Sequence, residues 1–233
     1  MHHSPASARH LARDEAWREA SLVGGIVSSL LYGAMIGAIG FEGYSLLSQA
    51  PSELTAIGAP TRALWMALGS VYTLLVTAFG WGVWKSAGRS RPLRVVGASI
   101  LAFGSLGLLW PFASMHSRDV LAAGGGTLSD TLHVVLSGVT VLLMFLAIAA
   151  GAAAFGKRFR LYSVSSIAVL LAFGALTFWQ APRLQANLPT PWMGLYERIN
   201  ITVFLLWVVV LATVLLRAEA PRARPSEEMR WKM

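Results

Sequence analysis

Six long apolar stretches, separated by short polar connections, constrain the fold of this chain more than any other feature. A helix crosses the hydrocarbon core of a bilayer with about 20 mostly apolar residues. Stretches of that kind cover residues 21–41, 63–84, 95–115, 131–154, 161–180 and 199–216. The sequence therefore predicts an all-α polytopic membrane protein, folded as a bundle of six transmembrane helices.

The composition excludes several other classes of protein. Charged residues make up 13% of the chain and hydrophobic residues 55%, whereas soluble domains carry about a quarter charged residues. An intrinsically disordered chain needs low hydrophobicity and high charge, so that class is excluded. The chain has no cysteine, which excludes disulfide scaffolds, cysteine-ligated zinc, iron–sulfur clusters and thiol catalysis.

The distribution of Lys and Arg predicts the orientation of the bundle, because cytoplasmic loops retain basic residues. Most of the 19 basic residues fall before the first stretch, in the second and fourth connections, and after the last stretch. The exceptions are Arg62, Arg118, Arg183 and Arg198. We therefore expect both termini to be cytoplasmic and the protein to lie in the plasma (inner) membrane. The net charge of +8 then reflects topology and contact with anionic lipid rather than nucleic-acid binding.

The short connections predict one six-helix transmembrane domain over residues 21–217. A cytoplasmic N-terminal segment (1–20) is expected to precede it, and a basic cytoplasmic tail (218–233) to follow it.

The first stretch carries a small residue once per helical turn along one face. These residues are Gly25, Ser29, Gly33 and Gly37. Because small residues let helices approach closely in lipid, the face is interpreted as a packing surface inside the bundle. Homodimerisation through the same face is the alternative.

Titratable residues in or beside the stretches gather on the predicted extracytoplasmic side. Burial of such groups in a membrane is costly and often marks a functional site. Asp130, His133 and Ser137 are spaced three and four residues apart, so they share one helical face. In one interpretation Asp130 caps the helix, His133 is structural and Ser137 bonds to its own helix. In the other, Asp130 and His133 bind a ligand or substrate.

A metal site is a further alternative. It would use His133 and Asp130 with a third ligand from another segment. The candidates for that ligand are His116, Glu42, Glu53 and Glu197. A hydrolase triad on one helix is less favoured, because no nucleophile turn or oxyanion hole accompanies it. A haem held by His116 and His133 is less favoured still, because neither histidine falls mid-membrane, and the residues identify no cofactor.

Glu197 and Arg198 open the sixth stretch. Adjacent residues on a helix point about 100° apart, so each is expected to find a partner on another segment. The expected partners are Arg62 or Arg183 for Glu197, and Glu53 or Glu42 for Arg198. Such ion pairs would fix the bundle. A role for Glu197, Arg198 and Arg62 in lining a binding pocket is the alternative.

Several short motifs together resemble a known family. They are Glu42–Ser45, Ser52–Leu54, Gly58–Arg62, Asp130–His133, Gly156–Ser163, Pro189–Trp192 and Glu197–Asn200. The chain resembles, over residues 22–217, the domain of unknown function family 998, a group of multi-pass prokaryotic membrane proteins. The resemblance implies the six-helix membrane fold and a conserved-looking outer face, and it implies no defined activity.

The sequence thus predicts an integral membrane protein that binds a small molecule or a lipid headgroup in a polar extracytoplasmic pocket. Asp130 would orient His133 there. The alternative is a metal-dependent, membrane-embedded hydrolase or transferase that acts on a lipid. Membrane lipids are the expected partners, and nucleic acids are not.

Overall fold

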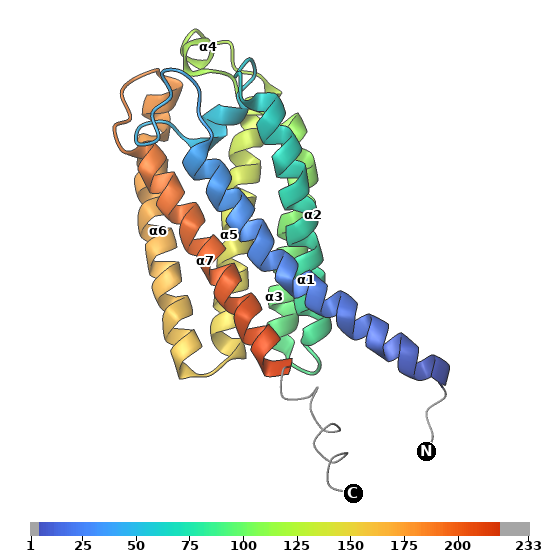
Figure 1. Cartoon of the computed structure of the whole chain (residues 1–233). Helices are drawn as coiled ribbons and strands as arrows, with labels where there is room; N and C mark the ends of the chain where they lie inside the picture. The colour runs from blue at the N-terminus through green and yellow to red at the C-terminus, as the bar shows by residue number, and fades with distance from the viewer. Residues whose placement is uncertain (1–4, 220–233) are drawn as a thin grey trace, which may run out of the picture.

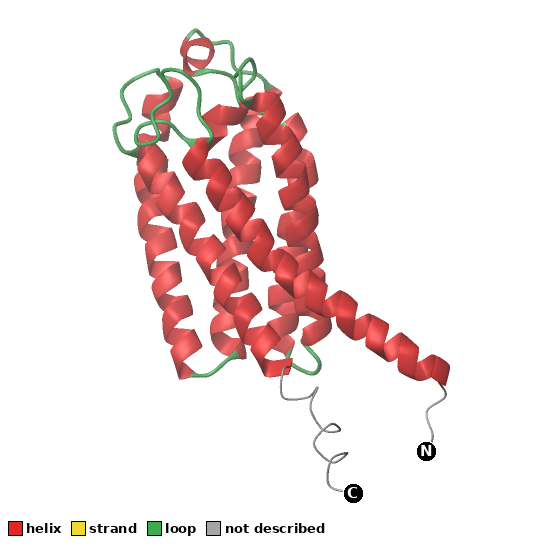
Figure 2. Cartoon of the chain, in the orientation of Figure 1, coloured by secondary structure: helices red, strands yellow, loops and turns green. Residues whose placement is uncertain are grey.

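Helices make up most of the described part of the chain, and loops make up the remainder. The computed structural model describes the backbone of residues 5–219 and the side chains of residues 13–218. The described part contains α1 (Pro5–Ala38), η1 (Pro51–Thr55), α2 (Arg62–Ser86), α3 (Arg91–Leu106), η2 (Gly107–Phe112), α4 (Arg118–Ala122), α5 (Leu128–Ala154), α6 (Lys157–Gln185) and α7 (Met193–Glu219). Six of these helices are long and apolar enough to cross a membrane, α3 together with η2, and they run side by side (Figure 2). The predicted all-α bundle of six spans is confirmed, and the chain is a multi-pass membrane protein.

The helices extend beyond the apolar stretches that predict them. The first stretch begins at residue 21, whereas α1 begins at Pro5, and its first half projects away from the bundle (Figure 1). Helical hydrogen bonds continue into the polar interface, because good helix formers such as Ala, Arg and Glu follow one another there. Most of the predicted segment 1–20 is therefore one helix with the first span. The predicted tail, residues 218–233, lies outside the described residues except for its first two positions.

The six long helices form a closed ring in chain order. Each of α1, α2, α3, α5, α6 and α7 packs against the next, and α7 packs against α1. Short connections suffice because neighbours in the chain are neighbours in space. We call the end at which α6 begins and α7 ends the basic end. The opposite end carries η1, η2, α4 and the longer loops (Figure 1), and we call it the capped end.

Large side chains fill the centre of the ring. Phe79, Phe204 and Trp207 are at most 1% exposed and belong to one hydrophobic cluster with residues of all six long helices. The indole N–H of Trp207 donates to the hydroxyl oxygen of Ser163 over 3.0 Å, so α7 and α6 also share a buried hydrogen bond. The ring therefore encloses a packed core.

The outward faces of the helices are apolar and exposed. Leu30, Leu74, Leu161 and Phe178 are between 67% and 77% exposed. Soluble proteins rarely expose apolar surface on this scale. In a bilayer these side chains face hydrocarbon, which agrees with the assignment of the helices as membrane spans.

Glycines let α2 and α3 approach closely. A methyl group added at Gly80 would lie 2.7 Å from the backbone nitrogen of Leu101, and one at Gly97 would lie 2.7 Å from that of Trp84. In α1, Gly25 lies directly against the ring of Phe79, whereas a methyl at Gly37 would meet open space. The predicted small-residue face thus packs inside the bundle at Gly25, and homodimerisation stays a prediction.

We expect Gly80→Ala to destabilise the protein by about 1–3 kcal/mol, because the methyl overpacks against backbone that cannot move aside. Gly69→Ala is the matched control, since it adds the same methyl to the same helix with nothing within 4 Å and gains helix propensity. Thermal unfolding in mild detergent compares the two variants. Equal melting temperatures would show that the α2–α3 contact does not limit stability.

Candidate functional site

A buried ion pair holds the loops of the capped end together. The Nη2 and Nε atoms of Arg118, the first residue of α4, donate to the two carboxylate oxygens of Glu53 in η1 over 2.6 and 2.8 Å. The side chains of Arg118 and Glu53 are only 15% and 8% exposed. A two-pronged guanidinium–carboxylate pair is among the strongest polar contacts in proteins, and it fixes relative orientation as well as distance.

The same two side chains reach further loop segments. Glu53 accepts from the backbone N–H of Ala50, the residue just before η1. Arg118 donates to the hydroxyl of Thr190 over 2.8 Å and to the carbonyl of Ser48 over 3.1 Å. The Thr190 hydroxyl donates in turn to the same carbonyl. Arg118 therefore joins the α1–α2 loop, α4 and the α6–α7 loop in one network.

A second arginine, Arg198, holds the α1–α2 loop to α7. Its guanidinium donates to four backbone carbonyls, those of Ile36, Leu46, Gln49 and Gly194, over 2.8–3.0 Å. It also donates to the hydroxyl of Tyr44 over 2.7 Å. The pKa of Tyr44 is raised, chiefly by burial, so the hydroxyl keeps its proton and donates to the Ala50 carbonyl.

The predicted partners of Arg198 are therefore wrong. Arg198 contacts carbonyl oxygens and a phenol, whereas Glu53, expected as its partner, pairs with Arg118. The loop folds back over the start of α7 and presents backbone carbonyls that have no helical partner. A guanidinium satisfies several such acceptors at once, because it carries five N–H donors in a fixed plane.

Side chains at the start of α5 hold the loop that follows η2 through hydrogen bonds. Asp130 accepts from the backbone N–H of His116 over 2.7 Å, and its other oxygen lies 2.8 Å from Nδ1 of His116. It also accepts from the backbone N–H of Thr127, as a helix cap does. The Ser129 hydroxyl donates to the carbonyl of Ser114 over 2.8 Å. These bonds hold the loop segment that ends at His116, two residues before Arg118.

His133 and Ser137 do not join Asp130 as a functional set, although all three share a helical face. Nδ1 of His133 lies 2.8 Å from the carbonyl oxygen of Ala113, which can only accept, so Nδ1 carries the hydrogen. The ring also packs edge-on to Trp110 at 5.1 Å between centroids. The Ser137 hydroxyl donates to the carbonyl of His133 in its own helix. Asp130 orients His116 and not His133.

The other predicted residues at this end make loop contacts or face solvent. Arg62 donates to the carbonyl of Thr55, and Arg183 donates to that of Pro189. Glu42 is exposed. Neither arginine pairs with Glu197, although both were expected as its partners.

Glu197 differs from every other charged residue buried at the capped end. It is partly buried, and no other described residue donates a hydrogen bond to it or forms an ion pair with it. Ile201, one turn further along α7, and Tyr32 of α1 both pack against the hydrophobic cluster around Trp65. Glu197 therefore lies near the contact between α1 and α7 with an unpaired carboxyl group.

Sequence reasoning missed several residues of this network. Arg118 was noted only for its side of the membrane, and Tyr44, Gln49 and Thr190 were not singled out for binding. The partners of Arg118, Tyr44 and Thr190 lie between 65 and 154 positions away in the chain or are backbone atoms. The one available signal was that Arg118 is a basic residue on the side of the membrane that has few.

Metal binding receives no support from side-chain positions. In the part of the chain with described side chains, no three His, Asp or Glu residues lie close enough together to hold a metal ion. His116 and Asp130 meet, but His133 turns to a backbone carbonyl.

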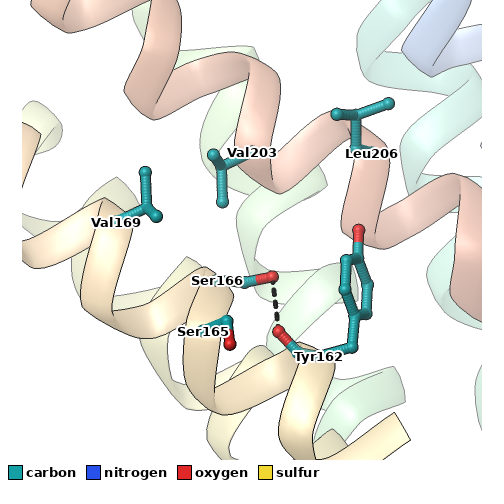
Figure 3. Close-up of a pocket in the computed structure, with 6 residues that line it drawn as sticks. All are labelled: Tyr162, Ser165, Ser166, Val169, Val203 and Leu206. Carbon is teal, nitrogen blue, oxygen red and sulfur yellow. Dashed lines mark hydrogen bonds between the residues drawn. The ribbon is translucent and has the colours of Figure 1, made fainter. Parts of the chain in front are cut away.

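A small cavity lies between α6 and α7, away from the capped-end network. Residues of α6 and α7 line it, and none of them is among the predicted site residues (Figure 3).

Comparison with known families supports the resemblance found in the motifs. The family described as "Protein of unknown function (DUF998)" matches residues 22–214. The chain belongs to this family. The matched range includes most of each of the six spans and the capped end. Neither a curated protein nor a solved structure matches the chain, and the family's description assigns no activity.

We expect Arg118→Met to destabilise the protein by about 3–5 kcal/mol, because it leaves the Glu53 carboxylate buried and unpaired. Adding Glu53→Gln to that variant should recover part of the loss, which a double-mutant cycle measures by equilibrium unfolding in mild detergent. Arg183→Met is the control, since Arg183 is exposed and contacts one carbonyl. A loss for Arg118→Met no larger than for Arg183→Met would contradict a structural role for the ion pair.

Proposed function

We propose that this membrane protein binds an ammonium-bearing small molecule or lipid headgroup beside Glu197, at an extracytoplasmic capped end. The observation that carries the proposal is the unpaired carboxylate of Glu197. Glu53, Arg118, Asp130 and Arg198 each bond to neighbouring segments at the same end. An ionised carboxylate partly withdrawn from water is costly unless it is paired, and a cationic ligand would supply the partner that the ionised form needs.

The surroundings of Glu197 suit an ammonium group better than a metal ion. An ammonium group offers three N–H donors, which the Glu197 carboxylate and the Tyr32 hydroxyl oxygen can accept. The face of a tyrosine ring also attracts a cation. The Tyr32 ring packs beside Trp65 at 6.1 Å between centroids and beside Tyr72 at 4.5 Å, so the aromatic side of the site is held in place.

The remaining predicted site residues have a bracing role in this proposal. Asp130 and His133 hold the loop before Arg118. Glu53, Arg62 and Arg198 hold the α1–α2 loop over the ends of α1 and α7. The alternative of a metal-dependent hydrolase or transferase has no observation in its favour, since the three ligands that it needs do not converge in the described residues.

We expect the wild-type protein to retain phosphatidylethanolamine over phosphatidylglycerol at this site, as measured by native mass spectrometry with equal amounts of both lipids. Glu197→Gln keeps the shape and removes the charge. It should weaken phosphatidylethanolamine binding by about tenfold or more, the worth of a charge-assisted hydrogen bond. Free ethanolamine, added as a competitor, distinguishes a headgroup site from a site for small amines.

Glu42→Gln is the matched control for that experiment, because Glu42 is an exposed carboxylate at the same end. Its lipid binding should equal that of the wild type. Equal retention of phosphatidylethanolamine by wild type and Glu197→Gln would overturn the proposal.

The proposal places the protein in the plasma membrane of a prokaryotic cell with both termini in the cytoplasm. The basic residues at the end where α6 begins and α7 ends support this orientation. Alkaline phosphatase, which is active only outside the cytoplasm, should be inactive when fused to the C-terminus. The same enzyme should be active when inserted at the exposed Gly124–Gly126 loop of the capped end. The reverse pattern would place the capped end in the cytoplasm.

A further inference from the structure

A groove of about 190 Å³ lies between α6 and α7. The residues that line it are Tyr162, Ser165, Ser166 and Val169 of α6 with Val203 and Leu206 of α7. Figure 3 shows the Tyr162 ring reaching toward α7 near Leu206, and the Ser166 hydroxyl bonded to the carbonyl of Tyr162. Ser165 and Leu206 are exposed, so the groove opens on the lipid side of the ring. The volume is below the roughly 300–1,000 Å³ of sites for drug-sized ligands, and it suits a segment of one hydrocarbon chain.

The face of α6 that lines the groove carries an arginine toward the basic end. Arg158, Tyr162, Ser165 and Val169 are spaced four, three and four residues apart, so they lie along one helical face. Arg158 is exposed and lies about 10 Å along the helix axis from Ser165, at 1.5 Å per residue. Arg158 therefore lies on the groove-lining face of α6, between the groove and the basic end.

The face of α7 that borders the groove also ends in an arginine. Leu206, Val210, Thr213 and Arg217 are spaced four, three and four residues apart along one helical face. Arg217 is exposed in the last turn of α7, about 16 Å along the axis from Leu206. Because α6 begins where α7 ends, Arg158 and Arg217 flank the groove at the basic end.

Both arginines are exposed. Neither donates a hydrogen bond to, or forms an ion pair with, another residue whose side chain is described. By contrast, the neighbouring Arg160 donates to the carbonyl of Ala152. The planar guanidinium matches phosphate oxygens with two parallel hydrogen bonds. An anionic lipid has an apolar chain and a negatively charged headgroup. An apolar groove with two positively charged groups toward one end is complementary to it.

We propose that the α6–α7 groove binds an acyl chain of an anionic phospholipid whose phosphate contacts Arg158 and Arg217. The charge favours this occupant over a second copy of the chain. A symmetric dimer formed through the groove would place the two arginines of each copy near those of the other, and like charges repel at the membrane surface. The proposal is independent of the ammonium site, which lies at the opposite end of the bundle.

Native mass spectrometry of the full chain with phosphatidylglycerol or phosphatidylcholine tests the charge requirement. The wild type should bind phosphatidylglycerol in preference to phosphatidylcholine. Each of Arg158→Gln and Arg217→Gln should weaken phosphatidylglycerol binding about fivefold, and the double variant about 25-fold, from the usual attraction between one arginine and an anionic lipid.

The double variant Arg89→Gln/Arg91→Gln is the matched control. It removes the same charge from exposed residues at the basic end, in the α2–α3 connection and at the start of α3, away from the groove. Its phosphatidylglycerol binding should equal that of the wild type. An equal loss in both double variants, or no loss in Arg158→Gln/Arg217→Gln, would overturn the proposal. Arg158→Lys, which keeps the positive charge, should retain most of the binding and guards against misfolding of the Gln variants.

Filling the groove tests the acyl-chain contact separately. Ser165→Phe should weaken phosphatidylglycerol binding with both arginines intact. Val164→Phe, at an exposed position beside the groove, should leave it unchanged. Equal binding by the two variants would overturn the groove as the site. A wild-type dimer that Ser165→Phe dissociates would assign the groove to a second copy and would also overturn the proposal.

Discussion

The exclusion of water from the hydrocarbon core is the constraint on which the whole structure depends. Polar backbone groups in that region need partners within the protein, which leaves helices as the economical solution for a chain with long apolar stretches. The same constraint moves charged side chains to the two ends of the bundle. The same requirement accounts for the buried hydrogen bond between Trp207 and Ser163 across α7 and α6.

At the capped end, arginine side chains supply hydrogen-bond donors to the backbone carbonyls of several loops. Irregular backbone near a membrane carries carbonyls without helical partners, and guanidinium groups supply several donors each. Arg198 donates to two loop carbonyls and to one carbonyl each in α1 and α7, and Arg118 joins the α1–α2 loop, α4 and the α6–α7 loop. Asp130 and His133 hold the short loop that places Arg118. Against this background the unpaired carboxylate of Glu197 is the exception, and for that reason it is the proposed ligand contact.

The two ends of the bundle thus differ in how their charges are used. At the capped end charged side chains bond mainly to the protein itself, which makes that end rigid. At the basic end Arg158 and Arg217 are exposed beside an apolar groove. A fixed cap and an exposed basic rim are compatible with a protein that meets small amines on one surface and anionic lipid on the other.

Local patterns were enough to predict the spans and their number, because hydrophobicity and length are properties of each stretch alone. The capping role of Asp130 was also predictable, since a helix cap bonds to residues within three positions. The partners of Glu53, Arg118 and Arg198 were not predictable. They depend on which loops meet at the capped end, and many acceptors there are backbone carbonyls that carry no sequence signal.

The sequence by itself determined that the chain is a six-span membrane protein and that its basic residues gather at one end. Burial in lipid acts on stretches of about 20 residues regardless of what they contact. Only the tertiary structure decided that Asp130 bonds to His116 instead of His133, and that Glu53 pairs with Arg118 instead of Arg198. It also decided that Glu197 has no partner among the described residues. Hydrogen bonds and ion pairs require their atoms within about 3 Å, and the closed ring sets those distances by bringing remote loops together.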